Sequence, residues 1–205
     1  MIRNIVFDMG NVLVRFDPDL FMQRIGVAEE DWPLLRREVF KSLEWAQMDR
    51  GSLTDAEAVP LMCNRLPKRL HGAAEELVTR WDLPILEIEG SYELVRELKE
   101  LGYSIYLLSN ASLRQHDYWP RVPASRYFDG TLISADVKII KPQPEIYGLL
   151  YEKFSLRPEE CFFIDDSNYN IEAALNSGMP GAVFYGDMAQ IRAKLREAGV
   201  PVSLP

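Results

Sequence analysis

The stretch that decides the fold is Ile5-Val6-Phe7-Asp8-Met9-Gly10, close to the N-terminus. Its first three residues form a short apolar run that predicts a buried strand, and Asp8 closes that strand just before a glycine turn. Open α/β sheets place their ligand chemistry at the carboxyl ends of strands. We therefore expect Asp8 to lie at a functional site on the edge of a sheet.

Three further polar clusters follow apolar runs along the chain. Ser109 and Asn110 come first, Lys141 stands before a proline, and Asp165 and Asp166 directly follow an apolar run. A hydroxyl and amide pair, a cation and an acidic pair therefore recur in this order after the first carboxylate. Each cluster alone is a weak signal, but together they indicate one catalytic constellation.

Predicted strands and helices alternate after residue 90. Continuous apolar runs are typical of buried parallel strands, and strands that alternate with helices imply right-handed crossovers. The fold class expected is therefore α/β, with a doubly wound, Rossmann-like parallel sheet. Strands are predicted over residues 103–109, 127–134, 161–164 and 182–185, and helices over 91–101, 144–154, 170–176 and 187–198.

The middle of the chain shows helical patterning without a convincing strand. Asp17 before a proline predicts a helix start, and Thr54 with Glu57 predicts a capping box. We expect residues 17–83 to form a small α-helical cap, inserted after the first strand and placed over the strand ends. The core domain then comprises residues 1–16 and 84–205.

Composition narrows the function classes. The 205 residues carry 31 acidic against 23 basic side chains, a formal net charge of −8, which disfavours binding to nucleic acid or an anionic membrane. Cys63 and Cys161 have the apolar surroundings of buried thiols, and the N-terminus shows neither a leader nor a membrane span. We expect a cytoplasmic protein whose partner is a small molecule; the sequence does not specify the oligomeric state.

Taken together, the four clusters resemble the signatures of the haloacid dehalogenase superfamily of phosphotransferases in type, order and setting. The resemblance implies that Asp8 attacks a phosphoryl group, giving an aspartyl phosphate that water hydrolyses. It also implies Mg²⁺ as cofactor, bound by Asp8, the backbone carbonyl of Gly10 and Asp166, with Asp165 adjacent to the ion.

The resemblance assigns the remaining two clusters to the transferring phosphoryl group. Ser109 and Asn110 are expected to donate hydrogen bonds to its oxygens. Lys141 is expected to balance the charge of the nucleophile and the phosphate. The resemblance covers the core and leaves the cap unassigned.

Gly10 is the departure from the family pattern. Most phosphatases of this superfamily carry a second aspartate at this position, where it acts as general acid and base and contributes roughly 10²–10⁴-fold to the rate. Glycine does neither. Asp17 is the first candidate for a substitute acid/base, although an Asp-Pro pair also suits a helix cap, and Glu44 and Asp49 of the cap are weaker candidates.

The predicted function is a Mg²⁺-dependent phosphatase of a small phosphometabolite. Members with the same Asp-x-Gly-Asn-Val arrangement resemble bacterial glucose-1-phosphate phosphatases, and an anomeric oxygen leaves with little acid assistance, so a sugar 1-phosphate is the expected substrate. A 2-haloacid dehalogenase and a binding protein impaired by Gly10 are the alternatives. Paired carboxylates at Asp165 and Asp166 would repel Asp8 without a cation, which argues against the metal-free dehalogenase. Retention of all the charged groups argues against the binding protein.

Overall fold

The sheet of this protein has five parallel strands in the order β3-β2-β1-β4-β5. It is seen in a computed structural model that describes residues 1–203. The strand that ends before Asp8 is central, and the strands that end at Ser109 and Asp165 are its two neighbours. Three of the four polar clusters are thereby brought to one edge. The strands are β1 (Asn4–Phe7), β2 (Ser104–Ser109), β3 (Gly130–Ile133), β4 (Cys161–Asp165) and β5 (Gly181–Val183).

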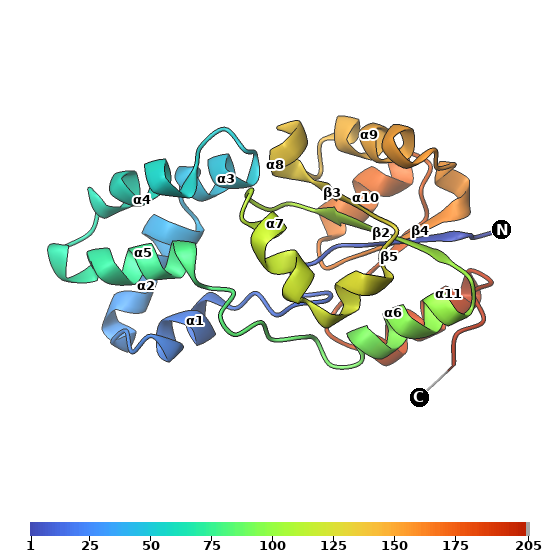
Figure 1. Cartoon of the computed structure of the whole chain (residues 1–205), viewed down its shortest axis with the longest axis horizontal. Coiled ribbons are helices and arrows are strands. Elements are labelled where there is room, and N and C mark those ends of the chain that lie inside the picture. Colours follow the sequence, from blue (N-terminus) through green and yellow to red (C-terminus); the bar gives the residue numbers. More distant parts are fainter. Residues whose placement is uncertain (204–205) are drawn as a thin grey trace.

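Both faces of the sheet are covered by helices. Because side chains alternate along a strand, Ile5 and Phe7 pack into one apolar cluster and Val6 packs into another on the opposite face. In Figure 1, α6 (Ser91–Glu100) and α11 (Met188–Glu197) lie below the sheet, and α9 (Pro144–Phe154) and α10 (Asn168–Asn176) lie above it. This arrangement confirms the doubly wound α/β fold predicted from the sequence.

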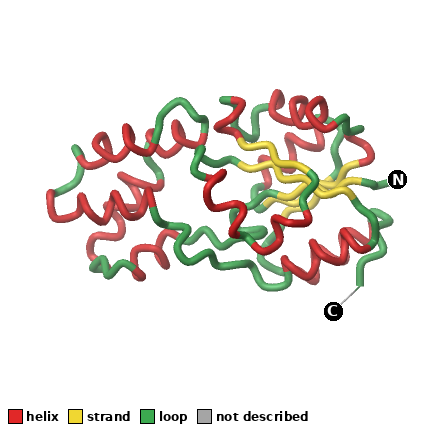
Figure 2. The backbone as a smooth tube through the Cα atoms, in the orientation of Figure 1, coloured by secondary structure: helices red, strands yellow, loops and turns green. Residues whose placement is uncertain are grey.

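Helices account for most of the chain between Pro18 and Thr79. Figures 1 and 2 show them gathered on one side of the sheet, as helices joined by loops. Asp17 caps the first of them, and Thr54 and Glu57 form the predicted capping box of the fourth. These helices are α1 (Pro18–Arg24), α2 (Trp32–Leu35), a π-helical turn (Arg36–Phe40), α3 (Leu43–Asp49), α4 (Asp55–Cys63) and α5 (His71–Thr79).

The last turn of α3 is seated on the core. Gly51 follows it with φ of +72°, and a Cβ at this position would lie 2.2 Å from the carbonyl oxygen of Ala135. Ser134 Oγ donates to the carbonyl oxygen of Asp49 at 2.5 Å and accepts from the amide of Ala111 at 2.9 Å. The end of α3 is thus held next to the loop that follows β2.

Short helices occupy the remaining crossovers. The predicted strand over residues 127–134 is too long, because Pro123–Tyr127 forms a 3-10 helix and β3 begins only at Gly130. The other short elements are α7 (Gln115–Tyr118), α8 (Ser134–Val137) and the 3-10 turns Glu29–Asp31, Lys68–Leu70, Trp119–Arg121 and Pro158–Glu160. Across residues 1–203, no helix combines the length and apolar character that a membrane crossing needs.

Candidate active site

Lys141 joins three neighbouring strands at the carboxyl edge of the sheet. Its ammonium group donates to Asp8 Oδ1 at 2.8 Å, to Asp165 Oδ2 at 2.6 Å and to the carbonyl oxygen of Leu108 at 2.9 Å. These acceptors belong to the ends of β1, β4 and β2. All three protons of the ammonium are therefore used, and the buried cation has two carboxylate partners.

The segment that carries Lys141 is positioned by Asn110. The Asn110 amide donates to the carbonyl oxygen of Lys141 at 2.9 Å and accepts from its backbone N–H at 2.8 Å. This two-point contact holds the loop against the end of β2, where Ser109 is buried. Since the Asn110 amide is engaged in this way, its donation to a phosphoryl oxygen, like that of Ser109, stays a prediction.

The two adjacent acids at the end of β4 have different surroundings. Asp165 is fully buried and accepts hydrogen bonds from the backbone N–H of Ser167 at 2.8 Å and from Asn170 Nδ2 at 2.9 Å. Asp166 is exposed and accepts from Asn11 Nδ2 at 3.3 Å. Asp165 is therefore fixed by the protein, whereas Asp166 keeps oxygen lone pairs available for a ligand.

Burial and mutual repulsion govern the charges at this edge. Burial is the main reason that the pKa of Asp8 is raised to about 7; Lys141 opposes the rise, and Asp165 adds to it. Although Asp166 is exposed as a residue, partial desolvation of its carboxyl group raises its pKa, again with a contribution from Asp165. For Lys141, burial acts to lower the pKa, but Asp8 and Asp165 together raise it, so the lysine stays charged. Three carboxyls with one cation leave an excess of negative charge that a metal ion would neutralise.

The donor set fits Mg²⁺. Asp8, Asp165 and Asp166 each offer an oxygen, and these oxygens lie within 4.8 Å of one another. Opposite ligands of an octahedral Mg²⁺ with bonds of about 2.1 Å stand about 4.2 Å apart, so small movements bring such oxygens around one ion. Carboxylate oxygens with free positions for water and phosphate are the usual surroundings of this ion. The role of the Gly10 carbonyl stays a prediction.

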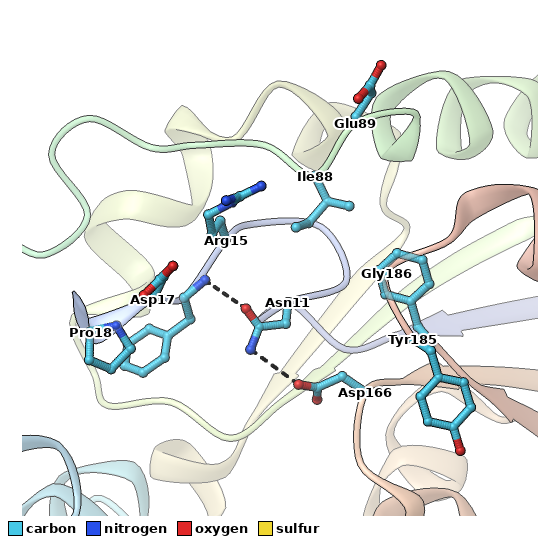
Figure 3. A pocket seen from close by; sticks show the side chains of 11 residues that line it. Asn11, Arg15, Asp17, Pro18, Ile88, Glu89, Asp166, Tyr185 and Gly186 are labelled. Atoms are coloured by element: carbon cyan, nitrogen blue, oxygen red, sulfur yellow. Dashed lines mark hydrogen bonds between the residues drawn. The ribbon is translucent and has the colours of Figure 1, made fainter. Parts of the chain in front are cut away.

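A cavity of about 580 Å³ opens beside Asp166. Figure 3 shows Asn11 and Asp166 in its wall, with the bond between their side chains. In the same view the Asp17 carboxylate lies next to Pro18, and Asn11 lies between Asp17 and Asp166. Asp17 Oδ1 accepts from the backbone N–H groups of Asp19 and Leu20, as expected for a helix cap. Its role as a substitute acid/base stays a prediction.

Two asparagines were not assigned a role from the sequence. Asn11 has φ of +54° and bridges the nucleophile loop, donating to Asp166 and accepting from the backbone N–H of Phe16 at 3.0 Å. Asn170, near the start of α10, holds both oxygens of Asp165. Asn11 carries a sequence signal, because asparagine adopts the left-handed region more readily than most residues. Asn170 has none, since its contact depends on tertiary structure.

A family model of haloacid dehalogenase-like hydrolases matches residues 2–178. The chain belongs to this family. The match on which this membership rests includes Asp8, Lys141 and the Asp165–Asp166 pair. Membership makes the protein a hydrolase, as predicted.

Two curated relatives of this hydrolase and one solved structure span most of its length. The pyrophosphatase PpaX of Bacillus cereus is 24% identical over 180 residues, covering 86% of this chain and 80% of that protein. The D-ribitol-5-phosphate phosphatase of Bacteroides thetaiotaomicron is 28% identical over 192 residues, covering 87% and 89%. A HAD family enzyme from Bacteroides thetaiotaomicron, solved as a magnesium complex, is 25% identical with a TM-score of 0.68 and covers 89% and 93%. Both curated relatives are named for the hydrolysis of phosphorus–oxygen bonds.

Proposed function

We propose that this hydrolase is a Mg²⁺-dependent phosphatase of a small phosphometabolite. The observation that carries the proposal is the buried Asp8 carboxylate, held by Lys141 beside two further carboxylates that suit a magnesium ion. The similar enzyme solved as a magnesium complex supports the choice of metal. The two relatives named as a pyrophosphatase and a sugar-alcohol phosphate phosphatase support the reaction class.

The residues of this chain divide the work of phosphoryl transfer. Asp8 attacks phosphorus while the bond to the leaving oxygen breaks, which gives an aspartyl phosphate and the free alcohol. Lys141 keeps one oxygen of Asp8 in place, so the other is free to point at the substrate. Bound Mg²⁺ supplies positive charge to the phosphoryl oxygens and to Asp8. Water then attacks the aspartyl phosphate, releasing phosphate and restoring Asp8.

For the substrate, we propose a phosphosugar, with sugar 1-phosphates as the first compounds to test. Gly10 places no carboxyl beside the leaving oxygen, and an anomeric oxygen needs less help to leave than an alkoxide. The relative named for D-ribitol 5-phosphate is consistent with a polyhydroxy substrate. Residues 17–83 would act as the cap that encloses it, because α3 reaches the loop after β2.

Dehalogenation of a 2-haloacid is the alternative within the same fold. In that reaction Asp8 displaces halide from carbon, and no metal is needed. The excess of carboxylates around Asp8 favours the phosphatase, because Asp165 and Asp166 both raise the pKa of the nucleophile unless a cation is present. A binding protein without turnover would have no need for this arrangement of charges.

The test is a panel of phosphorylated metabolites and 2-haloacids, assayed with Mg²⁺ and with EDTA. We expect phosphate release that EDTA abolishes and Mg²⁺ restores, and we expect Asp8→Asn to be inactive while its circular dichroism spectrum is unchanged. Halide release in EDTA would establish the dehalogenase instead. Turnover by Asp8→Asn within tenfold of the parent would remove Asp8 from the role of nucleophile.

A further inference from the structure

A small cavity lies between the cap helices and the core, beside the nucleophile loop. Its volume is about 50 Å³, and its core wall includes Met9, directly after Asp8, and Ala111 and Ser112, which follow the Ser109–Asn110 cluster. A water molecule takes about 30 Å³ in the liquid, so this space has room for one water molecule. The cavity therefore borders the two segments that directly follow Asp8 and the Ser109–Asn110 cluster.

Asp49 is the acidic residue of α3 that borders this cavity, and Asp55 of α4 also borders it. The backbone carbonyl of Asp49 is fixed by Ser134, which also holds the amide of Ala111. Among the hydrogen bonds of residues 1–203, none involves the Asp49 carboxyl group, and the cavity that it borders is also lined by Trp45, Trp81 and Tyr118. A carboxyl group in this position is free to exchange a proton with whatever occupies the cavity.

We propose that Asp49 is the general acid and base of this hydrolase, supplied by the cap in place of the carboxyl group that Gly10 lacks. This inference rests on the proposed phosphatase function. In the first step the Asp49 carboxyl gives its proton to the leaving oxygen as the bond to phosphorus breaks. In the second, the Asp49 carboxylate takes a proton from the water that attacks the aspartyl phosphate, which returns both groups to their starting state.

The electrostatics of the cavity suit both steps. Burial, with a smaller contribution from Asp55, raises the pKa of Asp49 to about 7, so acid and base forms are both populated near neutral pH. Burial raises the pKa of Tyr118 well above its usual range, and the charges of Asp49, Asp82 and Asp8 add to the rise, so this phenol stays neutral. Tyr118 lines the small cavity together with Asp49.

The other two candidates are engaged elsewhere. Glu44 accepts from both terminal nitrogens of Arg65, at 2.9 and 2.7 Å, and this contact lowers its pKa. Asp17 caps α1 and borders the larger cavity next to Asp166. Among the acids that the sequence suggested, Asp49 alone combines access to the small cavity with an unengaged carboxyl group.

Asp49→Asn tests the proposal through the leaving group, because only a proton donor responds to leaving-group basicity. On alkyl phosphates and sugar 6-phosphates, we expect kcat/KM to fall by roughly 10²–10⁴-fold. On p-nitrophenyl phosphate, whose phenolate leaves unaided, kcat/KM should stay within tenfold, with a pre-steady-state burst of nitrophenol because hydrolysis of the aspartyl phosphate has lost its base. Glu76→Gln, which removes a charge from the exposed side of α5, is the matched control and should match the parent on every substrate.

A second carboxyl at position 10 gives an independent test. A Cβ added to Gly10 would meet only Asp8 Oδ2, at 4.0 Å, so the backbone leaves room for the first carbon of an aspartate side chain there. Gly10→Asp combined with Asp49→Asn should recover most of the rate on sugar 6-phosphates that Asp49→Asn alone loses.

Three outcomes would overturn the assignment. They are an equal loss on all substrates in Asp49→Asn, a large gain in Gly10→Asp alone, and a leaving-group-dependent loss in Asp17→Asn with none in Asp49→Asn. The last result would assign the proton to Asp17. A failure of the proposed phosphatase function itself would be recognised separately, because turnover would then persist in Asp8→Asn.

Discussion

Replacing Asp49 by asparagine should make the folded protein more stable above neutral pH. The pKa of Asp49 is raised from 3.8 to about 7, mainly by burial, so the folded state holds a proton that the unfolded chain releases. A raised pKa means that the stabilising effect of this proton is complete below about pH 4 and is lost as pH rises towards 7. The loss amounts to at most about 4 kcal/mol at pH 8, since each tenfold change in proton affinity is worth about 1.4 kcal/mol.

Urea denaturation of the parent and of Asp49→Asn in EDTA, at pH 5.5 and 8.5, measures this cost. Asparagine has nearly the same shape and does not titrate, so all other groups cancel in the comparison. We expect the free energy of unfolding of Asp49→Asn to gain about 2 kcal/mol over the parent between the two pH values. A difference between the two proteins that is the same at both pH values would show that the Asp49 carboxyl is not held in a buried site. The stability reasoning would then fail, whatever the activity of the variant.

Two further predictions concern the acidic pair and the seat of the cap. Asp165→Ala should lower the free energy of unfolding by about 3–5 kcal/mol, because it removes a buried partner of Lys141. Asp166→Ala should unfold like the parent but require more Mg²⁺ for half-maximal activity. Thermal unfolding and Mg²⁺ titration measure the two effects, and equal effects in both variants would contradict the division of roles. Gly51→Ala should destabilise the protein by at least about 2 kcal/mol, because it adds a Cβ at positive φ directly against the backbone of Ala135. Urea denaturation measures this loss, and an unchanged urea midpoint would show that α3 is not held against the core.

Local patterns in the sequence were sufficient for most elements of this fold. Asp17 and Thr54 mark helix starts through contacts within four residues, so both caps were predictable. The apolar run before Asp8 likewise predicted β1. The strand predicted from Tyr127 failed, because Pro123 begins a 3-10 helix whose last residue takes up the first part of that segment.

The part of the site that could be predicted from the sequence consists of residues that directly follow predicted strands. Asp8 and Asp165 end neighbouring strands, and parallel pairing brings them to one edge, where Lys141 meets both. The engagement of Asn110 with the backbone of the Lys141 loop depends on two segments 31 residues apart, and nothing in either segment signals it. The raised pKa of Asp49 was even less predictable, since it comes from burial in the tertiary structure, which no local sequence pattern records.

The position of Asp49 on α3 has a consequence for exchanging parts between members of this family. In a chimera that keeps this core and receives the insertion of a relative, Asp8 and its partners would remain, but the donor at the end of α3 would leave with residues 17–83. Such a hybrid would bind metal and fold, yet would turn over only esters that need no proton. Gly10 would have to be exchanged for aspartate at the same time, so exchanging the insertion would change substrate recognition and, with Asp49 as the proposed donor, proton supply together.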